Sequence, residues 1–92
     1  MPDKAQERQA RLRALVATIE AAGQAGGRWD VLVNAAMRKW NVTRRTATQD
    51  LDDVTASYRY AVSRYGIVRI TDTGRRFLQA KPVLEEVSGD AE

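Results

Sequence analysis

Three stretches of helical periodicity, joined by short connectors, most constrain what this chain can fold into. In residues 6–22 the apolar residues that recur on one helix face are Leu12, Leu15, Val16, Ile19 and Ala22. The corresponding face of residues 30–40 contains Val33, Ala36, Met37 and Trp40. The face of residues 43–57 contains Ala47, Leu51 and Val54. These three patterns together predict a core of three helices.

The connectors between the helical stretches carry residues that begin and end helices. A short strand is expected at residues 28–29, and Asp30 is then expected to cap the amino terminus of the second helix. Asn41 tolerates a left-handed conformation and is expected to end that helix. Thr43 is expected to cap the third helix, so the second and third helices meet across a short turn.

The composition argues against catalysis. The chain has 92 residues with no cysteine and no histidine, so thiolate and imidazole groups are lacking for metal binding and for nucleophilic chemistry. A chain this short buries too little apolar surface to hold a catalytic cleft beside a stable core. Its acidic residues form no convincing pair for acid–base work. We therefore expect a binding module that is not an enzyme and has no cofactor and no metal ion.

Charge is unevenly distributed along the chain. Residues 1–81 contain all 15 Lys and Arg but 8 of the 12 Asp and Glu, a balance of +7, and residues 82–92 contain the other four acids, a balance of −4. A basic body attracts polyanions, because Lys and Arg that neutralise phosphates release condensed counterions. The amino-terminal residues are charged and the apolar runs are short, which predicts an intracellular protein, cytoplasmic and associated with the nucleoid.

The polar face of the third helix is the first candidate for nucleic-acid recognition. It lies opposite the apolar face on the helical wheel and contains Arg45, Thr46, Gln49, Asp52 and Asp53, with Arg44 and Thr48 on its flanks. Arginine, threonine and glutamine are side chains that read base edges and bind phosphates. The acids lie further along the helix, where we expect them to pair with arginines or to repel phosphates outside the contact area.

Residues 58–71 allow two interpretations. Alternating tyrosine and valine in residues 58–62, a turn at residues 63–66 and β-branched residues after it favour a hairpin with arginine at its tip. The apolar residues of the same region also fit a helical stripe that continues the third helix and ends at Gly66. We favour the hairpin. Its arginines, expected to contact phosphates, are Arg59, Arg64 and Arg69.

Thr71 is expected to cap a short last helix that Pro82 interrupts near Lys81. The polar and acidic residues 88–92 are expected to be disordered. The chain is thus interpreted as one domain, residues 1–87, followed by an acidic tail, residues 88–92.

Two segments resemble known transcription regulators. Residues 36–51, with the turn Asn41-Val42-Thr43, resemble the helix-turn-helix of bacterial and archaeal regulators, including the DeoR-like ones. Residues 70–78, ITDTGRRFL, resemble the segment that closes the wing and opens the last helix in MarR-like and PadR-like regulators. The resemblance implies a winged helix-turn-helix: a mainly α fold with a small β-hairpin, in which a three-helix core carries a wing and a short C-terminal helix.

The resemblance further implies sequence-selective binding of double-stranded DNA by a prokaryotic transcription regulator or mobile-element accessory protein. Helix 43–57 would enter the major groove, hairpin 58–71 would be the wing, and the first and last helices would form a homodimer. The residues expected to contact DNA are Thr43, Arg44, Arg45, Thr46, Thr48, Gln49, Arg59, Arg64 and Arg69.

Two other functions stay open at this point. One is a protein-interaction module of a larger complex, which the acidic tail favours. The other is an RNA-binding protein, in which tyrosines among arginines would stack on bases: Tyr58, Tyr60 and Tyr65.

Overall fold

Each of the three helical patterns forms a helix in the computed structural model, which describes residues 4–80. The elements follow in the order α1 (Lys4–Ala21), η1 (Gly23–Ala25), β1 (Gly27–Arg28), α2 (Trp29–Trp40), α3 (Arg44–Asp52), η2 (Asp53–Ser57), β2 (Ala61–Arg64), β3 (Ile67–Ile70) and α4 (Asp72–Gln79). This part of the chain is mainly helical with a small antiparallel sheet, as the sequence predicted. The expectations for Pro82 and for residues 88–92 lie outside the described residues.

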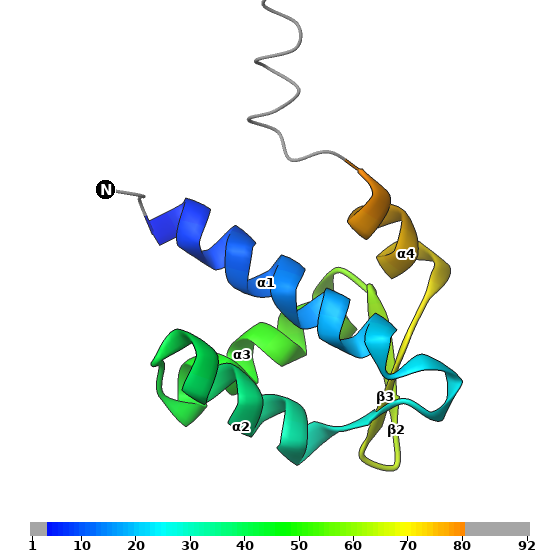
Figure 1. Ribbon diagram of the computed structural model, residues 1–92, viewed down its shortest axis with the longest axis horizontal. Helices are drawn as coiled ribbons and strands as arrows, with labels where there is room; N and C mark the ends of the chain where they lie inside the picture. Colours follow the sequence, from blue (N-terminus) through cyan, green and yellow to red (C-terminus); the bar gives the residue numbers. More distant parts are fainter. Residues whose placement is uncertain (1–3, 81–92) are drawn as a thin grey trace, which may run out of the picture.

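One apolar core joins the helices to the sheet. Helix α1 packs against α2, α3, β3 and α4, and Figure 1 shows it extending across the other helices. The buried apolar side chains are Leu12, Leu15, Val16, Ile19, Leu32, Val33, Ala47, Leu51, Val54, Ala61 and Val68. This set confirms the predicted faces of α1 and α3, except for Ala22, which lies just beyond the end of α1 and is half-buried. In α2 the buried face also includes Leu32, which the prediction left out.

The turn between α2 and α3 forms as predicted, but the start of α2 does not. Asn41 ends α2 with φ 53°, and the hydroxyl of Thr43 accepts a hydrogen bond of 3.2 Å from the backbone N–H of Thr46. At the other end, Arg28 occupies the cap position of α2, and Asp30 lies in the first turn. The prediction of Asp30 as the cap is therefore wrong. The helix begins earlier because β1 leads directly into it at Trp29.

The α-helix that begins at Arg44 does not continue to Gly66, as the alternative interpretation required. The helix widens into the π-helical turn η2, after which Arg59 adopts a left-handed backbone with φ 57°. The backbone N–H of Tyr60 then donates to the carbonyl of Val54 at 2.9 Å. The predicted helix over residues 43–57 is thus an α-helix that ends at Asp52, followed by the turn η2.

Strands β2 and β3 form the hairpin, so the alternative of a continuous helix is excluded. Arg64 pairs with Ile67, and the two-residue turn between them has positive φ at both positions, 53° at Tyr65 and 78° at Gly66. Such a turn matches the right-handed twist of paired strands. The strands are shorter than the predicted hairpin of residues 58–71, and the tip is Tyr65 with Gly66 rather than an arginine. β1 adds a third strand beside β3, in the order β1-β3-β2.

Helix α4 docks on the loop that precedes β2. The Thr71 hydroxyl caps α4 by accepting from the N–H of Gly74 at 3.1 Å, as predicted. Gly74 lies against the carbonyl of Tyr60, where an added Cβ would come within 2.0 Å of the oxygen. At the other end, Arg13 of α1 donates hydrogen bonds to the last carbonyls of the helix, those of Phe77, Leu78 and Ala80. Helix α4 is thereby fixed at both ends.

Candidate nucleic-acid interface

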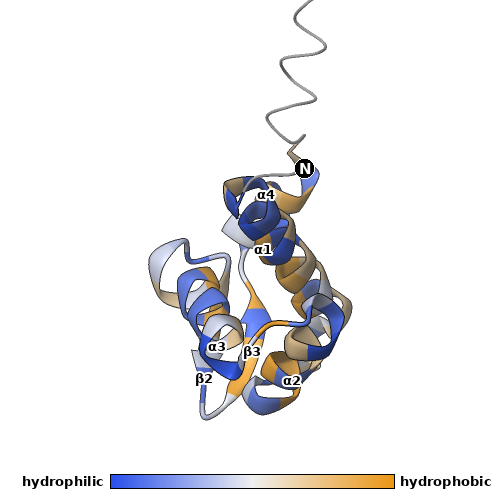
Figure 2. Ribbon diagram, turned by 90° about the vertical axis from the view of Figure 1, so that its left-hand side faces the viewer, coloured by the Kyte–Doolittle hydropathy of each residue, from blue (hydrophilic) through white to orange (hydrophobic). Residues whose placement is uncertain are grey.

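Helix α3 separates an apolar side from a polar side. Ala47 and Leu51 are fully buried against the core, whereas Arg45 and Gln49, one turn apart on the other side, are exposed. In Figure 2 most of α3 has a hydrophilic colour, and β3 contains a hydrophobic segment. The division of faces predicted for this helix is confirmed for these four residues.

The residues at the start of α3 differ in how free their side chains are. The Thr43 hydroxyl forms the helix cap, and its oxygen also lies 3.2 Å from the hydroxyl oxygen of Thr46. The residue Thr46 is half-buried. Arg44 donates a hydrogen bond of 2.9 Å from Nη2 to Oδ1 of Asn34 on α2. The side chain of Arg45 has no hydrogen bond or ion pair with any residue in the range 4–80, so its guanidinium is the one most open to an external partner among these residues. Thr48 is half-buried on the flank of the helix.

Asp53 does not lie on the exposed polar face, and its predicted place there is wrong. Its side chain is buried and forms an ion pair with Arg8 through Oδ2. Its other oxygen, Oδ1, accepts a hydrogen bond of 3.1 Å from Nε2 of Gln49. The helical wheel of α3 could not indicate this burial, because the covering group comes from α1, 45 residues earlier in the chain.

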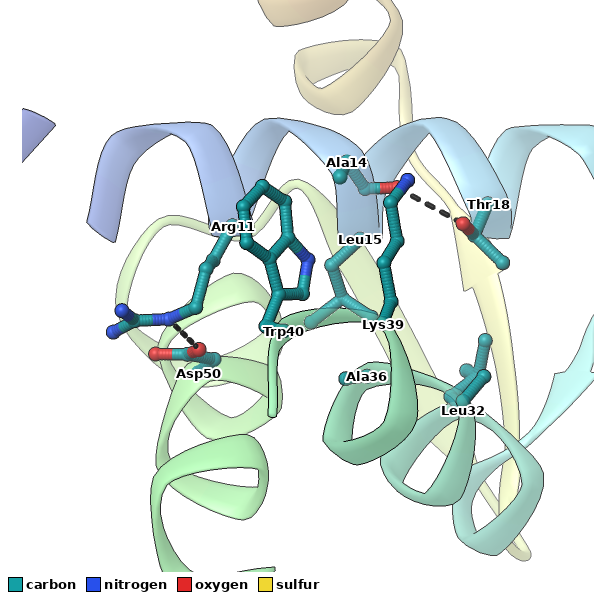
Figure 3. A pocket seen from close by; sticks show the side chains of 10 residues that line it. Arg11, Ala14, Leu15, Thr18, Leu32, Ala36, Lys39, Trp40 and Asp50 are labelled. Carbon is teal, nitrogen blue, oxygen red and sulfur yellow. Dashed lines mark hydrogen bonds and ion pairs between the residues drawn. The ribbon is translucent and has the colours of Figure 1, made fainter. Parts of the chain in front are cut away.

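A second ion pair joins the same two helices. Nε of Arg11 donates to Oδ2 of Asp50 at 2.8 Å, and the Asp50 side chain is 5% exposed (Figure 3). The hydrogen bond with Asp50, and then the charges of Asp50 and Glu7, raise the pKa of Arg11, although burial acts in the opposite direction. Arg11 therefore stays charged. With Asp50 and Asp53 both paired to α1, Asp52 is the acid of α3 that remains exposed.

The outer face of the sheet carries arginines from all three strands. Cross-strand partners point to the same side of a sheet, so the pairs Arg64–Ile67, Arg28–Ile67 and Val62–Arg69 lie opposite the buried residues Ala61 and Val68. We call Arg28, Arg64 and Arg69 the sheet arginines; all three are exposed. Sequence reasoning missed Arg28, because its place in this row depends on the pairing of β1 with a strand 40 residues away.

The sheet arginines are not equally available. Arg69 donates from Nε to the carbonyl of Gln24 at 2.8 Å, and Arg28 forms an exposed ion pair of 3.4 Å with Asp30. The side chain of Arg64 has no hydrogen bond or ion pair within the described part of the chain. Arg59 does not belong to this face, because it lies in the loop before β2, and its predicted place in the hairpin is wrong. The carbonyl of Arg59 accepts a hydrogen bond of 2.6 Å from the Thr71 hydroxyl.

The tyrosines that an RNA-binding protein would use for base stacking differ in their exposure. Tyr60 stacks between Tyr58 and Phe77, with ring centroids 5.2 Å and 4.2 Å away, and the guanidinium of Arg13 covers Phe77. Burial raises the pKa of Tyr60, and Tyr58 adds to that effect. Tyr60 is therefore an internal packing residue. Tyr65, at the hairpin tip, is fully exposed.

A small pocket of about 40 Å³ lies between α1 and α2. Figure 3 shows the Trp40 ring between Arg11 and Lys39 at this place, and Leu15 and Leu32 also line the pocket. Trp40 and Trp29 are partly buried, and Trp29 packs against the core. The pocket is far below the size of a cofactor or drug-like ligand site.

Comparison of the chain with protein-family models, with curated proteins and with solved structures gives no match. None of the helices in residues 4–80 has the length and the apolar character needed to cross a membrane. Functional inference therefore depends on the side chains of α3 and of the sheet.

Proposed function

We propose that this protein is a winged helix-turn-helix domain that binds double-stranded DNA, with α3 in the major groove and the β2–β3 hairpin as the wing. The observation that carries the proposal is the side of α3 opposite Ala47 and Leu51, where Arg45 is exposed without a partner among the described residues. Cations at a helix amino terminus are mildly unfavourable because of the helix dipole. No side-chain contact of Arg45 within the described chain compensates for this unfavourable interaction. Binding of an external anion by Arg45 would compensate for it.

The pairing of α3 acids with α1 supports the same proposal. A carboxylate on the DNA side of a recognition helix repels phosphates, and two of the three acids in residues 50–53 are drawn into ion pairs with Arg8 and Arg11. Their negative charge is neutralised by arginines of α1. The sheet arginines supply positive charge on a second element, which suits contact with the DNA backbone beside the major groove.

As a regulator of this class, the protein would act in the cytoplasm of a prokaryotic cell, on the nucleoid, as a transcription regulator or mobile-element accessory protein. A homodimer formed through α1 and α4 would place two α3 helices on a partly palindromic site. The large apolar side chains that are exposed in residues 4–80 lie on other elements: Val31, Tyr58, Val62 and Tyr65. Such a dimer would therefore depend on polar contacts or on residues outside that range.

The proposal is tested by comparing Arg45→Ala with Arg64→Ala on a duplex obtained by selection from random sequences. Arg45→Ala should lose roughly 1–3 kcal/mol of binding free energy on the selected duplex and little on a scrambled one, because it removes a base contact. Arg64→Ala should weaken binding to both duplexes alike and lower the slope of log affinity against log salt by about one. Fluorescence anisotropy at several salt concentrations measures both effects.

The matched control is Arg38→Ala, which removes an exposed arginine from α2, outside the proposed contact area. It should change affinity less than either variant. Equal losses on both duplexes for Arg45→Ala would exclude base reading by this residue. If the unsubstituted protein binds no duplex at low salt, the DNA proposal fails, and preferential binding of single-stranded RNA would favour an RNA-binding protein. Binding of neither nucleic acid would favour a protein-interaction module.

A further inference from the structure

The carboxylate of Asp53 is divided between two helices. Oδ2 receives the guanidinium of Arg8 from α1, and Oδ1 receives Nε2 of Gln49 from α3. Asp53 itself is 8% exposed, whereas Gln49 is exposed. The three residues therefore form a chain of contacts that runs from α1, through a buried acid, to a side chain on the outer side of α3.

A carboxylate accepts hydrogen bonds and donates none. The side-chain amide of Gln49 must therefore turn its NH2 group, and not its oxygen, toward Asp53. The reverse orientation would place the amide oxygen against a carboxylate oxygen, with no proton between them. Arg8 holds the other carboxylate oxygen, Oδ2, so Oδ1 is the oxygen that faces the Gln49 amide.

With one N–H donated to Asp53, Gln49 keeps its amide oxygen and its second N–H for an external partner. In the major groove, adenine offers a donor at N6 and an acceptor at N7, which match this pair, whereas guanine offers two acceptors at O6 and N7. An amide that is free to rotate accommodates both purines better than an amide whose oxygen is held outward. Gln49 lies one helical turn after Arg45 on the same side of α3, so both reach the same partner.

We propose that Asp53, held by Arg8, is a positioning residue that orients the amide of Gln49 for an adenine in the DNA major groove. The proposal rests on the proposed DNA-binding function and adds to it the base that one side chain reads. Asp53 does not touch the DNA. Its effect is on the choice between adenine and guanine at one base pair, and Gln49 makes the contact.

The test begins with the unsubstituted protein and the Gln49→Ala variant, compared by binding-site selection from random duplexes. Gln49→Ala should lose the preference for adenine at one position and keep the others. At that position, replacing adenine by purine, which lacks the N6 amino group, or by 7-deazaadenine, which lacks N7, should each weaken the unsubstituted protein about tenfold. The Gln49→Ala variant should be insensitive to both replacements.

Asp53→Asn then tests the positioning role, because asparagine both donates and accepts and so permits either orientation of the Gln49 amide. The discrimination between adenine and guanine at the same position should fall about tenfold, with the other positions unchanged. Asp52→Asn is the matched control, since it removes the same charge from the exposed neighbour of Asp53. It should raise affinity for all duplexes slightly and leave the base preference as it is.

Three results would overturn the proposal: full discrimination retained in Asp53→Asn, no change of preference in Gln49→Ala, or no effect of either adenine analogue. If Asp53→Asn does not fold, the analogue experiment and the amide ¹⁵N–¹H signals of Gln49 in the unsubstituted protein decide instead. The two Nε2 protons of Gln49 should have clearly different chemical shifts, because only one of them is donated to the carboxylate. Failure of the unsubstituted protein to bind any duplex would instead refute the proposed DNA-binding function. The three results above leave duplex binding intact and refute only the roles given to Asp53 and Gln49.

Discussion

Tyr65 adopts a left-handed backbone that suits few side chains. Its φ is 53°, at the first position of the hairpin turn, and its ring contacts nothing because it is fully exposed. Asparagine is preferred at such a position, whereas a bulky residue there is strained. Tyr65→Asn should therefore stabilise the protein by roughly 1 kcal/mol and raise Tm by about 5 °C in a thermal unfolding scan.

The control for this prediction is Gly66→Ala at the next residue. Its φ is 78°, and an added Cβ would meet no atom within 4 Å, so the substitution changes backbone strain alone. It should lower Tm by a similar amount. An unchanged or lower Tm for Tyr65→Asn would mean that the tyrosine is not strained in the folded protein.

Tyr60 gives the fold a dependence on alkaline pH. Burial raises the pKa of Tyr60 above the ordinary value of 10.0, so the folded chain binds this proton more tightly than the unfolded chain does. The stabilisation is complete below the ordinary pKa and is lost as pH rises through the raised pKa. Tyr60→Phe should show a smaller loss of unfolding free energy between about pH 8 and about pH 11 in urea titrations. Identical pH profiles would contradict the prediction.

At the scale of elements, α4 depends on the absence of a side chain at residue 74. A Cβ there would lie 2.0 Å from the carbonyl oxygen of Tyr60 and 2.9 Å from Cγ1 of Ile70. Because the nearest atom belongs to the backbone, α4 would have to move away from the loop. Gly74→Ala should lower the unfolding free energy by about 3 kcal/mol, measured by urea unfolding.

Gly27→Ala is the matched control for Gly74→Ala. A Cβ at residue 27 would meet Leu32 side-chain atoms at 3.4 Å, an ordinary van der Waals contact. Its effect should stay within about 1 kcal/mol. Comparable losses for the two substitutions would show that close contact with the Tyr60 carbonyl is not what requires glycine at residue 74.

At the scale of the whole molecule, the four acids of residues 82–92 oppose the +7 balance of residues 1–81. A variant with these acids replaced by amides, Glu85→Gln, Glu86→Gln, Asp90→Asn and Glu92→Gln, should bind duplex DNA several-fold more tightly at low salt. The gain should vanish near 1 M salt, where the Debye length falls to about 3 Å. A gain that persists at high salt would indicate a specific contact and not long-range charge.

The sequence by itself determined those helix ends at which the capping contacts join residues close together along the chain. The cap at Thr43, the cap at Thr71 and the left-handed end at Asn41 each involve atoms within a few residues along the chain. The buried faces of α1 and α3 were equally predictable, because helical periodicity alone places their apolar residues on one side. These features were enough to predict a mainly α chain whose third helix has a polar face.

Only the tertiary structure decided the features that depend on which segments meet. Residues 58–71 fit both a strand pattern and a helix pattern, and the hairpin forms where β3 pairs with β1 and β2. Asp53 is buried because α1 brings Arg8 to it, and Arg28 joins Arg64 across the sheet because β1 pairs with β3. The Arg8–Asp53 ion pair joins residues 45 positions apart, and the pairing of β1 with β3 joins residues about 40 apart. A periodic pattern within one segment holds no information about either contact.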